Sequence, residues 1–220
     1  MDLSHEPSGP AGSGPPLTLL EARILGSLVE KAATTPDVYP LTLNNVVLAC
    51  NQKTAREPTM NLNPGDVGHA LRQMEVRGLV KSQYGSRSER YLHRIDRVFD
   101  LTPAQTCLLS LLFLRGPQTL HELLARSERQ HRFADIDDVR HTLERLSERD
   151  PAMVRRIPRG SGQREDRYAH LLCGEPAAVE TSARSTPEAS PSFFDELLSR
   201  IEKIEDRITS LEKGSSQEIS

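Results

Sequence analysis

One sequence pattern occurs twice in this chain of 220 residues, and the repeat limits the folds that the chain can adopt. The letters DVGHAL at residues 66–71 correspond to DVRHTL at residues 138–143. Two further matches flank this pair, LTLLEA with LTPAQT at residues 17 and 101, and SRSERY with GQREDRY at residues 86 and 162. A solenoid needs more and shorter repeats. The pattern therefore predicts two tandem domains of one fold, the alternative being a chance alignment of two helical segments.

The first copy has the order helix, loop, helix and hairpin between Leu41 and His93. Its second helix is expected to begin after Asn63-Pro64, a capping residue followed by proline at the first helical position. The apolar residues of this helix recur at helical spacing, at Val67, Ala70, Leu71 and Met74. Gly78 is expected to end the helix. A hairpin follows, so the order predicts a winged helix-turn-helix, in a mainly α fold with small β-hairpins (α+β).

The second copy begins at Thr102-Pro103, again a capping residue followed by proline. Its first helix is apolar most of the way round, which predicts that it is packed between the two domains. Acids at residues 135–138 are expected to open the third helix, where they suit the positive end of the helix dipole. The hairpin that follows is the most cationic stretch of the chain, with Arg155, Arg156, Arg159 and Arg164 and no acid before Glu165.

A long polar loop separates the two helices of the first helix-turn-helix, where three or four residues are usual. It spans residues 50–58 and carries Lys53 and Arg56. These cations could contact phosphates or hold an anionic ligand. The structural alternative, which we favour, is that Asn51 and Gln52 satisfy backbone groups beside the helix ends.

Several separate motifs resemble one family. CNQKTAREPTMNL, the earlier TTPDVYPLTLN and the later LRGPQTLHELLAR and REDRYAHL are similar to the YceH-like family of uncharacterised bacterial proteins. The resemblance covers about residues 17–173 and implies a tandem winged-helix architecture. It implies no biochemical activity, so it assigns no functional residue.

The segments outside the two copies differ from them in charge and composition. Residues 1–16 carry a net charge of −2 and residues 174–220 carry −5, so the part between them is mildly basic although the whole chain carries −3. The predicted organisation is a disordered arm, two winged-helix domains, a flexible linker, a coiled-coil helix and a disordered tail, at residues 1–16, 17–98, 99–173, 174–191, 192–213 and 214–220. An apolar heptad seam predicts that the coiled-coil helix forms a parallel homodimer through Leu197, Ile201, Ile204, Ile208 and Leu211. The alternative is a single amphipathic helix that docks on its own domain.

Motifs of catalysis and cofactor binding are incomplete. The sequence HELLA at residues 121–125 begins like the zinc motif HExxH but has alanine at the second ligand position. Three distant cysteines form neither a disulfide framework nor a CxxC pair. We therefore expect a protein without catalytic activity, cofactor or metal. The N-terminus lacks a secretion signal and no apolar run reaches the length of a membrane span, so a cytoplasmic location is expected.

The leading functional hypothesis is a non-catalytic, regulatory protein that binds double-stranded DNA through its paired winged helices. Mild basicity permits such binding without requiring it. The residues expected to contact DNA are Lys53, Arg56, His69, Arg72, Lys81, Arg87, Arg155, Arg156, Arg159 and Arg164. We expect a DNA-binding protein to present the arginines and lysine of its helices and hairpins on one continuous surface. The alternative is a protein-interaction scaffold of the kind found in segregation-and-condensation proteins, which would instead bury an apolar patch on an outer face.

Overall fold

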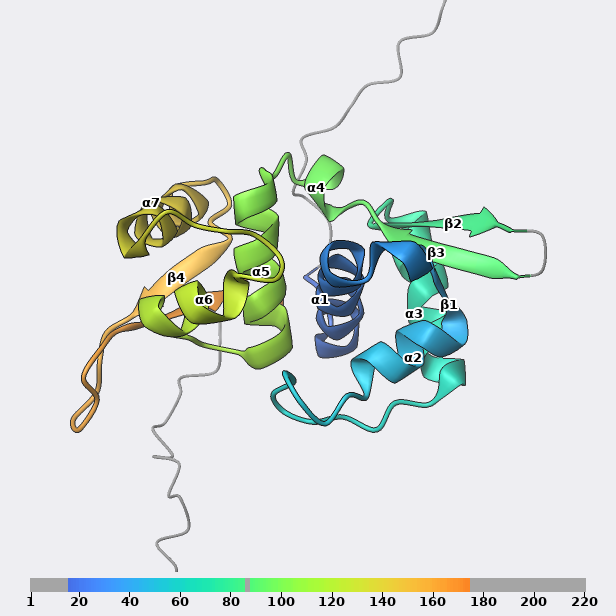
Figure 1. Cartoon of the computed structure of the whole chain (residues 1–220), viewed down its shortest axis with the longest axis horizontal. Coiled ribbons are helices and arrows are strands. Elements are labelled where there is room, and N and C mark those ends of the chain that lie inside the picture. Colours follow the sequence, from blue (N-terminus) through green and yellow to red (C-terminus); the bar gives the residue numbers. More distant parts are fainter. Residues whose placement is uncertain (1–15, 86–87, 175–220) are drawn as a thin grey trace, which may run out of the picture. The chain divides into compact units, whose positions relative to one another are not determined.

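The computed structural model describes residues 16–85 and 88–174, which all belong to one compact unit (Figure 1). The elements of residues 17–98, here called the first half, are α1 (Leu19–Thr34), a 3-10 helix (Pro36–Val38), β1 (Leu41–Thr42), α2 (Leu43–Cys50), α3 (Pro64–Val76), β2 (Val80–Tyr84), β3 (Glu89–His93) and α4 (Ile95–Val98). Those of residues 99–173, the second half, are α5 (Pro103–Arg115), α6 (Leu120–Ser127), α7 (Ile136–Ser147), β4 (Val154–Ile157) and β5 (Arg167–His170). The predicted combination of helices with small antiparallel hairpins is observed.

The strands form two small antiparallel sheets. In the first half the order is β1-β3-β2, with Tyr91 of β3 opposite Leu41 on one side and Ser82 on the other. In the second half β4 pairs with β5, and an isolated bridge joins Gln118 to Tyr168 at the place that β1 takes in the first half. A helix, a short extended segment, two helices and a hairpin therefore follow one another twice.

Local sequence signals fix the ends of the helices. The Thr18 hydroxyl accepts a hydrogen bond from the Glu21 backbone N–H, and the Glu21 carboxylate accepts one from the Thr18 N–H in return. Thr102 and Thr119 form the same reciprocal arrangement at α5 and α6. Gly78, with φ of +72°, follows the end of α3 in the left-handed conformation that glycine adopts without strain. The predicted helix start at Thr102 and the predicted helix end at Gly78 are confirmed.

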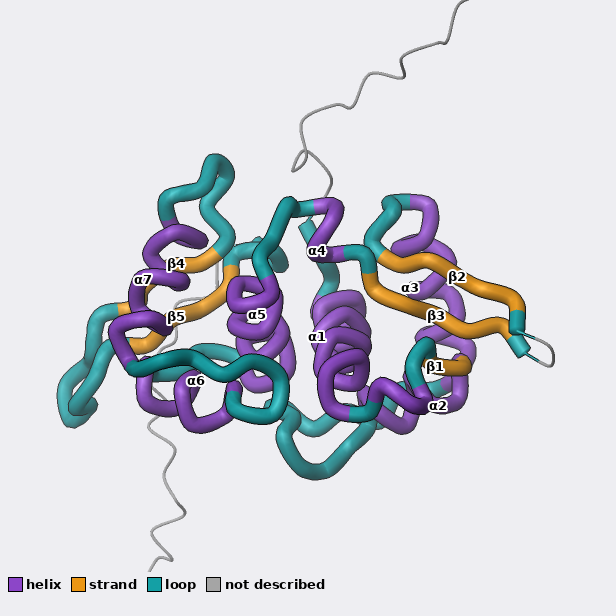
Figure 2. The backbone as a smooth tube through the Cα atoms, turned by 45° about the horizontal axis from the view of Figure 1, so that its top comes forward, coloured by secondary structure: helices purple, strands orange, loops and turns teal. Residues whose placement is uncertain are grey.

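The two halves meet where α1 packs against α5, and Figure 2 shows the two helices side by side. Gly26 lies at the point of closest approach. A Cβ atom added there would stand 2.8 Å from Cγ of Leu114 and 3.1 Å from Cβ of Phe113. Helix α5 has ten buried residues in succession, because α1 covers one side and α6, α7 and β5 cover the others. The prediction that this helix is packed on several sides is confirmed.

Two buried arginines hold the long polar loop between α2 and α3. Arg23 of α1 donates to the carbonyl oxygens of Cys50 and Pro58 at 3.3 and 2.7 Å. Arg56 donates to the Ala49 carbonyl at 2.9 Å and forms a two-pronged ion pair with the Glu30 carboxylate at 2.5 and 3.1 Å. Burial, and next the nearby Arg56 charge, lower the pKa of Arg23. The loop is thus built around side chains that satisfy its own backbone.

This arrangement corrects one predicted DNA contact. The Arg56 side chain is 0% exposed and committed to Glu30, so it does not reach a phosphate. The structural alternative for the loop is confirmed at Asn51, whose amide donates to the Leu62 carbonyl and accepts from the Leu62 N–H, both at 2.8 Å. Lys53 lies in the same loop and is exposed.

The two ends of the described region meet. The Leu17 backbone N–H donates to the Leu172 carbonyl at 2.7 Å, and the Cys173 thiol lies 3.7 Å from the Thr18 carbonyl oxygen. The first residue of the first half is thereby joined to the last turn of the second half. The predicted arm (1–16, apart from Pro16), linker beyond Gly174, coiled-coil helix and tail lie outside the described residues.

His170, the last residue of β5, packs its ring against an aromatic side chain of α5. Its ring packs edge-on against Phe113 of α5, with 4.8 Å between ring centroids. Within the described part of the chain, its buried Nδ1 has no hydrogen-bond partner. Burial lowers the pKa of His170 to about 4, because the charged imidazolium cannot be solvated there.

The stability of the fold should therefore fall as the solution becomes acidic. Below its ordinary pKa of about 6.5, His170 binds a proton in the unfolded chain but not in the folded one, down to a pH of about 4. This single group should lower the free energy of unfolding by up to about 1.4 kcal/mol per pH unit across that window. His170→Gln should weaken the pH dependence measured by urea unfolding at pH 7 and pH 5. The exposed His69→Gln is the control, and equal pH dependence in all three proteins would contradict the assignment.

The contact at Gly26 gives a second test of the fold. In Gly26→Ala, the added methyl group overlaps Leu114, and such overpacking costs about 1–3 kcal/mol, more than the gain of about 1 kcal/mol in helix propensity. After the gain in helix propensity is subtracted, we expect the free energy of unfolding to fall by up to about 2 kcal/mol. Gly68→Ala in α3 is the matched control, because its nearest contact would be an ordinary 3.7 Å and the variant should gain stability. A stabilised Gly26→Ala protein in urea unfolding would refute the close contact.

Candidate nucleic-acid interface

The outward face of α3 carries polar side chains suited to a nucleic acid. His69, Arg72 and Gln73 are exposed, whereas the intervening Ala70 and Leu71 are buried against the core of the first half. Asn63 caps the helix by accepting a hydrogen bond from the Asp66 N–H at 2.9 Å. The cap and the buried stripe therefore fix the side of the helix on which the three polar residues lie.

The hairpin β2–β3 stands beside this face and is tied to it. The Glu75 carboxylate of α3 accepts a hydrogen bond from the backbone N–H of Ser82 at 2.7 Å, and hydrogen bonds from Ser82 lower the pKa of Glu75. Lys81 is exposed on β2, and Tyr84 at the end of the strand is 86% exposed. Arg87, predicted at the tip, lies outside the described residues. His69, Arg72 and Lys81 are thus presented by neighbouring, connected elements.

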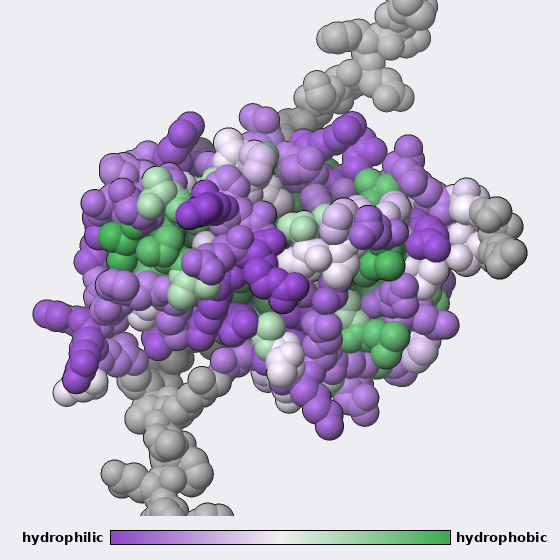
Figure 3. Space-filling model, viewed as in Figure 1, coloured by the Kyte–Doolittle hydropathy of each residue, from purple (hydrophilic) through white to green (hydrophobic). Residues whose placement is uncertain are grey.

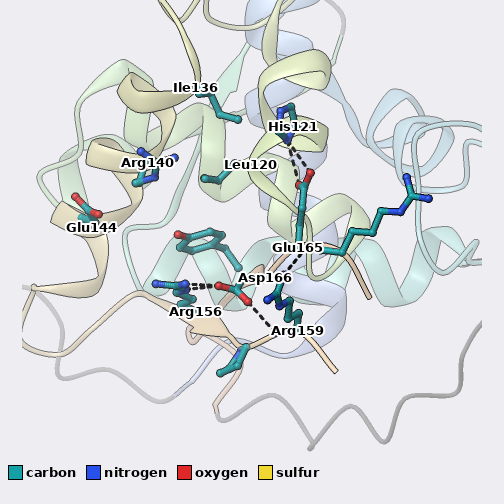
Figure 4. Close-up of a pocket in the computed structure, with 12 residues that line it drawn as sticks. Leu120, His121, Ile136, Arg140, Glu144, Arg156, Arg159, Glu165 and Asp166 are labelled. Carbon is teal, nitrogen blue, oxygen red and sulfur yellow. Dashed lines mark hydrogen bonds and ion pairs between the residues drawn. The ribbon is translucent and has the colours of Figure 1, made fainter. Parts of the chain in front are cut away.

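In the second half, the hairpin borders a hollow of about 670 Å³ between α6, α7 and the strands (Figure 4). Its apolar lining comes from Leu120, Ile136, Pro158 and Tyr168. Its charged lining mixes both signs, with Arg140, Arg156, Arg159 and Arg164 among Glu144, Glu165 and Asp166, and with His121 at one side. Ile136 at the start of α7 is only partly covered at this hollow.

The second hairpin is less cationic than its sequence predicted. Asp166 folds back on Arg156, which donates from Nε at 2.7 Å and again from Nη2, and the same carboxylate accepts the Arg159 backbone N–H at 2.8 Å (Figure 4). These hydrogen bonds, that of Arg159 first, lower the pKa of Asp166. Glu165 meets the His121 ring at 3.0 Å. The contact of Arg156 with DNA stays a prediction, for a side chain that is exposed and paired with Asp166 within the hairpin.

Arg155, Arg159 and Arg164 are exposed, so the hairpin retains cations on its surface. Arg159 uses Nη1 to donate to the Arg164 carbonyl oxygen at 3.2 Å, which braces the turn. The adjoining helix α7 is acidic on its outward face, where Asp137, Glu144 and Glu148 are exposed. Arg140 of this helix forms an ion pair with Asp137.

The two hairpins that carry predicted cations do not lie side by side. Hairpins β2–β3 and β4–β5 project from opposite ends of the described unit in both ribbon views (Figures 1 and 2). Because α1 and α5 lie between them, the expectation of a single continuous basic surface is wrong. Figure 3 shows polar side chains over most of one face, with apolar side chains gathered over α6 and α7 and on the side of α2 and α3.

Other kinds of site find little support in residues 16–85 and 88–174. Within these ranges, no cluster of three His, Cys, Asp or Glu side chains could hold a metal ion. None of their helices is long and apolar enough to cross a membrane. The predicted dimer contacts Leu197, Ile201, Ile204, Ile208 and Leu211 lie outside the described residues.

Sequence reasoning missed the acids that decide which arginines are available. Glu30 and Arg56 are 26 positions apart, and Asp166 is ten positions from Arg156. No spacing rule connects such pairs, because the fold of the chain brings them together. The pairing of Glu75 with the hairpin backbone likewise had no signal in the sequence.

Comparison with known proteins places the chain in a family. A family model described as "Protein of unknown function, DUF480" matches residues 17–163. A UPF0502 protein of Stenotrophomonas maltophilia (strain K279a) is 59% identical over 170 residues, which are 77% of each chain. A UPF0502 protein of Pseudomonas fluorescens (strain Pf0-1) is 53% identical over 201 residues, which are 90% of this chain and 92% of the relative. A UPF0502 protein of Xanthomonas campestris pv. campestris (strain B100) is 53% identical over 206 residues, which are 92% of each chain. The chain therefore belongs to the DUF480, or UPF0502, family of uncharacterised bacterial proteins, in agreement with the YceH-like resemblance of its motifs.

Proposed function

We propose that this protein is a non-catalytic DNA-binding protein built from two winged helices, with a regulatory role. The observation that carries the proposal is the joint presentation of α3 and hairpin β2–β3, with His69, Arg72, Gln73 and Lys81 exposed on adjoining elements. In winged helices of this order, the helix before the hairpin enters the major groove and the hairpin contacts the backbone beside it. Arginine and glutamine are side chains that read guanine and adenine edges.

The order of the elements supports the winged-helix interpretation. Each half has the sequence of helix, short extended segment, two helices and hairpin, and the third extended segment pairs with the first. This is the arrangement in which the hairpin forms the wing. An enzyme would need convergent catalytic groups, and the side chains at the second hairpin pair with one another, Arg156 with Asp166 and His121 with Glu165.

A protein-interaction scaffold is the second candidate. Exposed apolar side chains favour it, since Leu48 of α2 is 68% exposed and Val76 of α3 is 86% exposed. Large apolar side chains on an outer face mark protein contacts when they form a contiguous patch. A scaffold of this kind would not bind DNA. A titration of the protein with duplex DNA therefore distinguishes the two candidates.

Salt dependence of DNA binding tests the proposal. The protein should retard a random-sequence duplex at about 50 mM salt and lose affinity steeply towards about 200 mM, because bound phosphates release counterions. Lys81→Ala should lower the slope of log K against log salt by about one if Lys81 contacts one phosphate. Arg129→Ala is the control, an exposed cation that follows α6 in the second half. No retardation of duplex DNA at low salt would remove the DNA-binding proposal and leave the scaffold.

Homodimerisation through residues 192–213 is a proposal that stands on the heptad seam of the sequence. A dimer would raise the effective concentration of the winged helices at a shared target. Light scattering during size-exclusion chromatography should give twice the chain mass for the full protein and the monomer mass for a variant that lacks residues 190–220. Equal oligomeric states in the two proteins would exclude this segment as the dimer contact.

A further inference from the structure

The third helices of the two halves occupy equivalent places but differ in charge. In the repeat alignment, Val67 and Leu71 of α3 correspond to Val139 and Leu143 of α7, and all four side chains are buried at 0% exposure. The two helices therefore turn the same face towards their cores. Positions that lie on the opposite face can accordingly be compared one by one.

Two of the outward positions differ in the direction of negative charge on α7. Arg72 of α3 corresponds to Glu144 of α7 and Val76 corresponds to Glu148, whereas His69 corresponds to His141 and Gln73 to Arg145, all of them exposed. A glutamate in the groove faces the phosphates with like charge, whereas an arginine is attracted to them and can also bind guanine. The substitution thus reverses the electrostatic preference at the centre of the helix face.

Acids near the two helices add to this difference, although the hairpin of the second half keeps Arg155, Arg159 and Arg164 exposed. On α7, Asp137 and Asp138 add exposed acids at the start of the helix, and Arg140 is held by Asp137. On α3, Glu75 is turned to the hairpin backbone through Ser82. The Arg72 guanidinium extends along the helix towards Gly68 and Leu43 of α2, since a Cβ placed on Gly68 would lie 3.7 Å from Nη1 of Arg72. The guanidinium of Arg72 thus lies near Gly68, the residue of α3 that also neighbours Leu43 at the start of α2.

The halves also act at separate places. The two hairpins point away from each other at opposite ends of the described unit, with α1 packed on α5 between them (Figure 1). A duplex lying along α3 and hairpin β2–β3 is not positioned to lie along α7 as well. Each half must therefore bind DNA, or fail to bind it, by its own charges.

We infer that only the first half contacts DNA, with Arg72 as the residue that determines this contact and Glu144 as the equivalent residue that excludes the second half. The inference rests on the proposed DNA-binding function. It assigns one duplex to each chain, the α3 face as the reading surface, and Arg72 with Gln73 as residues that set preference among base pairs. The second half then contributes its buried α5 to the core and no base contact.

A charge exchange between equivalent positions tests the inference. Fluorescence anisotropy would follow binding of a labelled random duplex of about 20 base pairs to the full chain, at about 50 mM and 200 mM salt. Arg72→Glu should lower affinity more than tenfold, and Arg72→Gln should lower it less. Arg145→Glu, an equally large charge reversal on α7, is the matched control and should change affinity less than twofold. Glu144→Arg should retain the first site and bind a second duplex per chain.

The possible results distinguish the inference about the first half from the proposed DNA binding. Binding by the wild type that is lost in Arg72→Glu and kept in Arg145→Glu supports the inference, provided both variants melt at the wild-type temperature. Wild-type binding that survives Arg72→Glu but falls tenfold in Arg145→Glu overturns the inference and leaves DNA binding intact. Two duplexes per wild-type chain would overturn it as well. Absence of wild-type binding removes the proposed function and the inference with it.

Discussion

The contact between α1 and α5 is the constraint on which the other features depend. Neither helix could be left exposed, since α5 is buried along almost its whole length and α1 carries a continuous run of buried residues from Glu21 to Val29. Gly26 lets the two helices approach until Leu114 fills the space where another residue would carry a side chain. The same contact separates the two hairpins, so the packing of the core also fixes the directions in which the outer surfaces point.

Arginine serves three purposes in this fold, and its immediate sequence context does not distinguish them. Arg23 and Arg56 are buried and satisfy the backbone and carboxylate of one loop. Arg156 is exposed but neutralised by Asp166, whereas Arg72 is exposed on the face of α3. The net positive charge of residues 17–173 therefore overstates the charge available to an anionic partner, because some arginines already form ion pairs within the protein.

Local features of the fold were predictable from the sequence and distant pairings were not. Thr18 with Glu21 and Asn63 with Pro64 mark helix starts through contacts within one turn, and Gly78 marks a helix end. The site was predicted only in part. The exposure of His69 and Arg72 follows from helical periodicity, whereas the burial of Arg56 depends on its ion pair with Glu30 in another helix. The directions of the hairpins depend on how the halves pack, which periodicity does not encode.

The hydrogen bond between Leu17 and Leu172 brings the ends of the described region together. The backbone of this region therefore forms an almost closed ring, with a gap between its first and last residues. A short peptide joining residue 174 to residue 17 would close that ring, and a cut at Gly85 near the hairpin tip would open it elsewhere, with α1 still packed on α5. The order in which the two halves are synthesised is thus separable from the architecture that they build, which makes the unit suited to circular permutation.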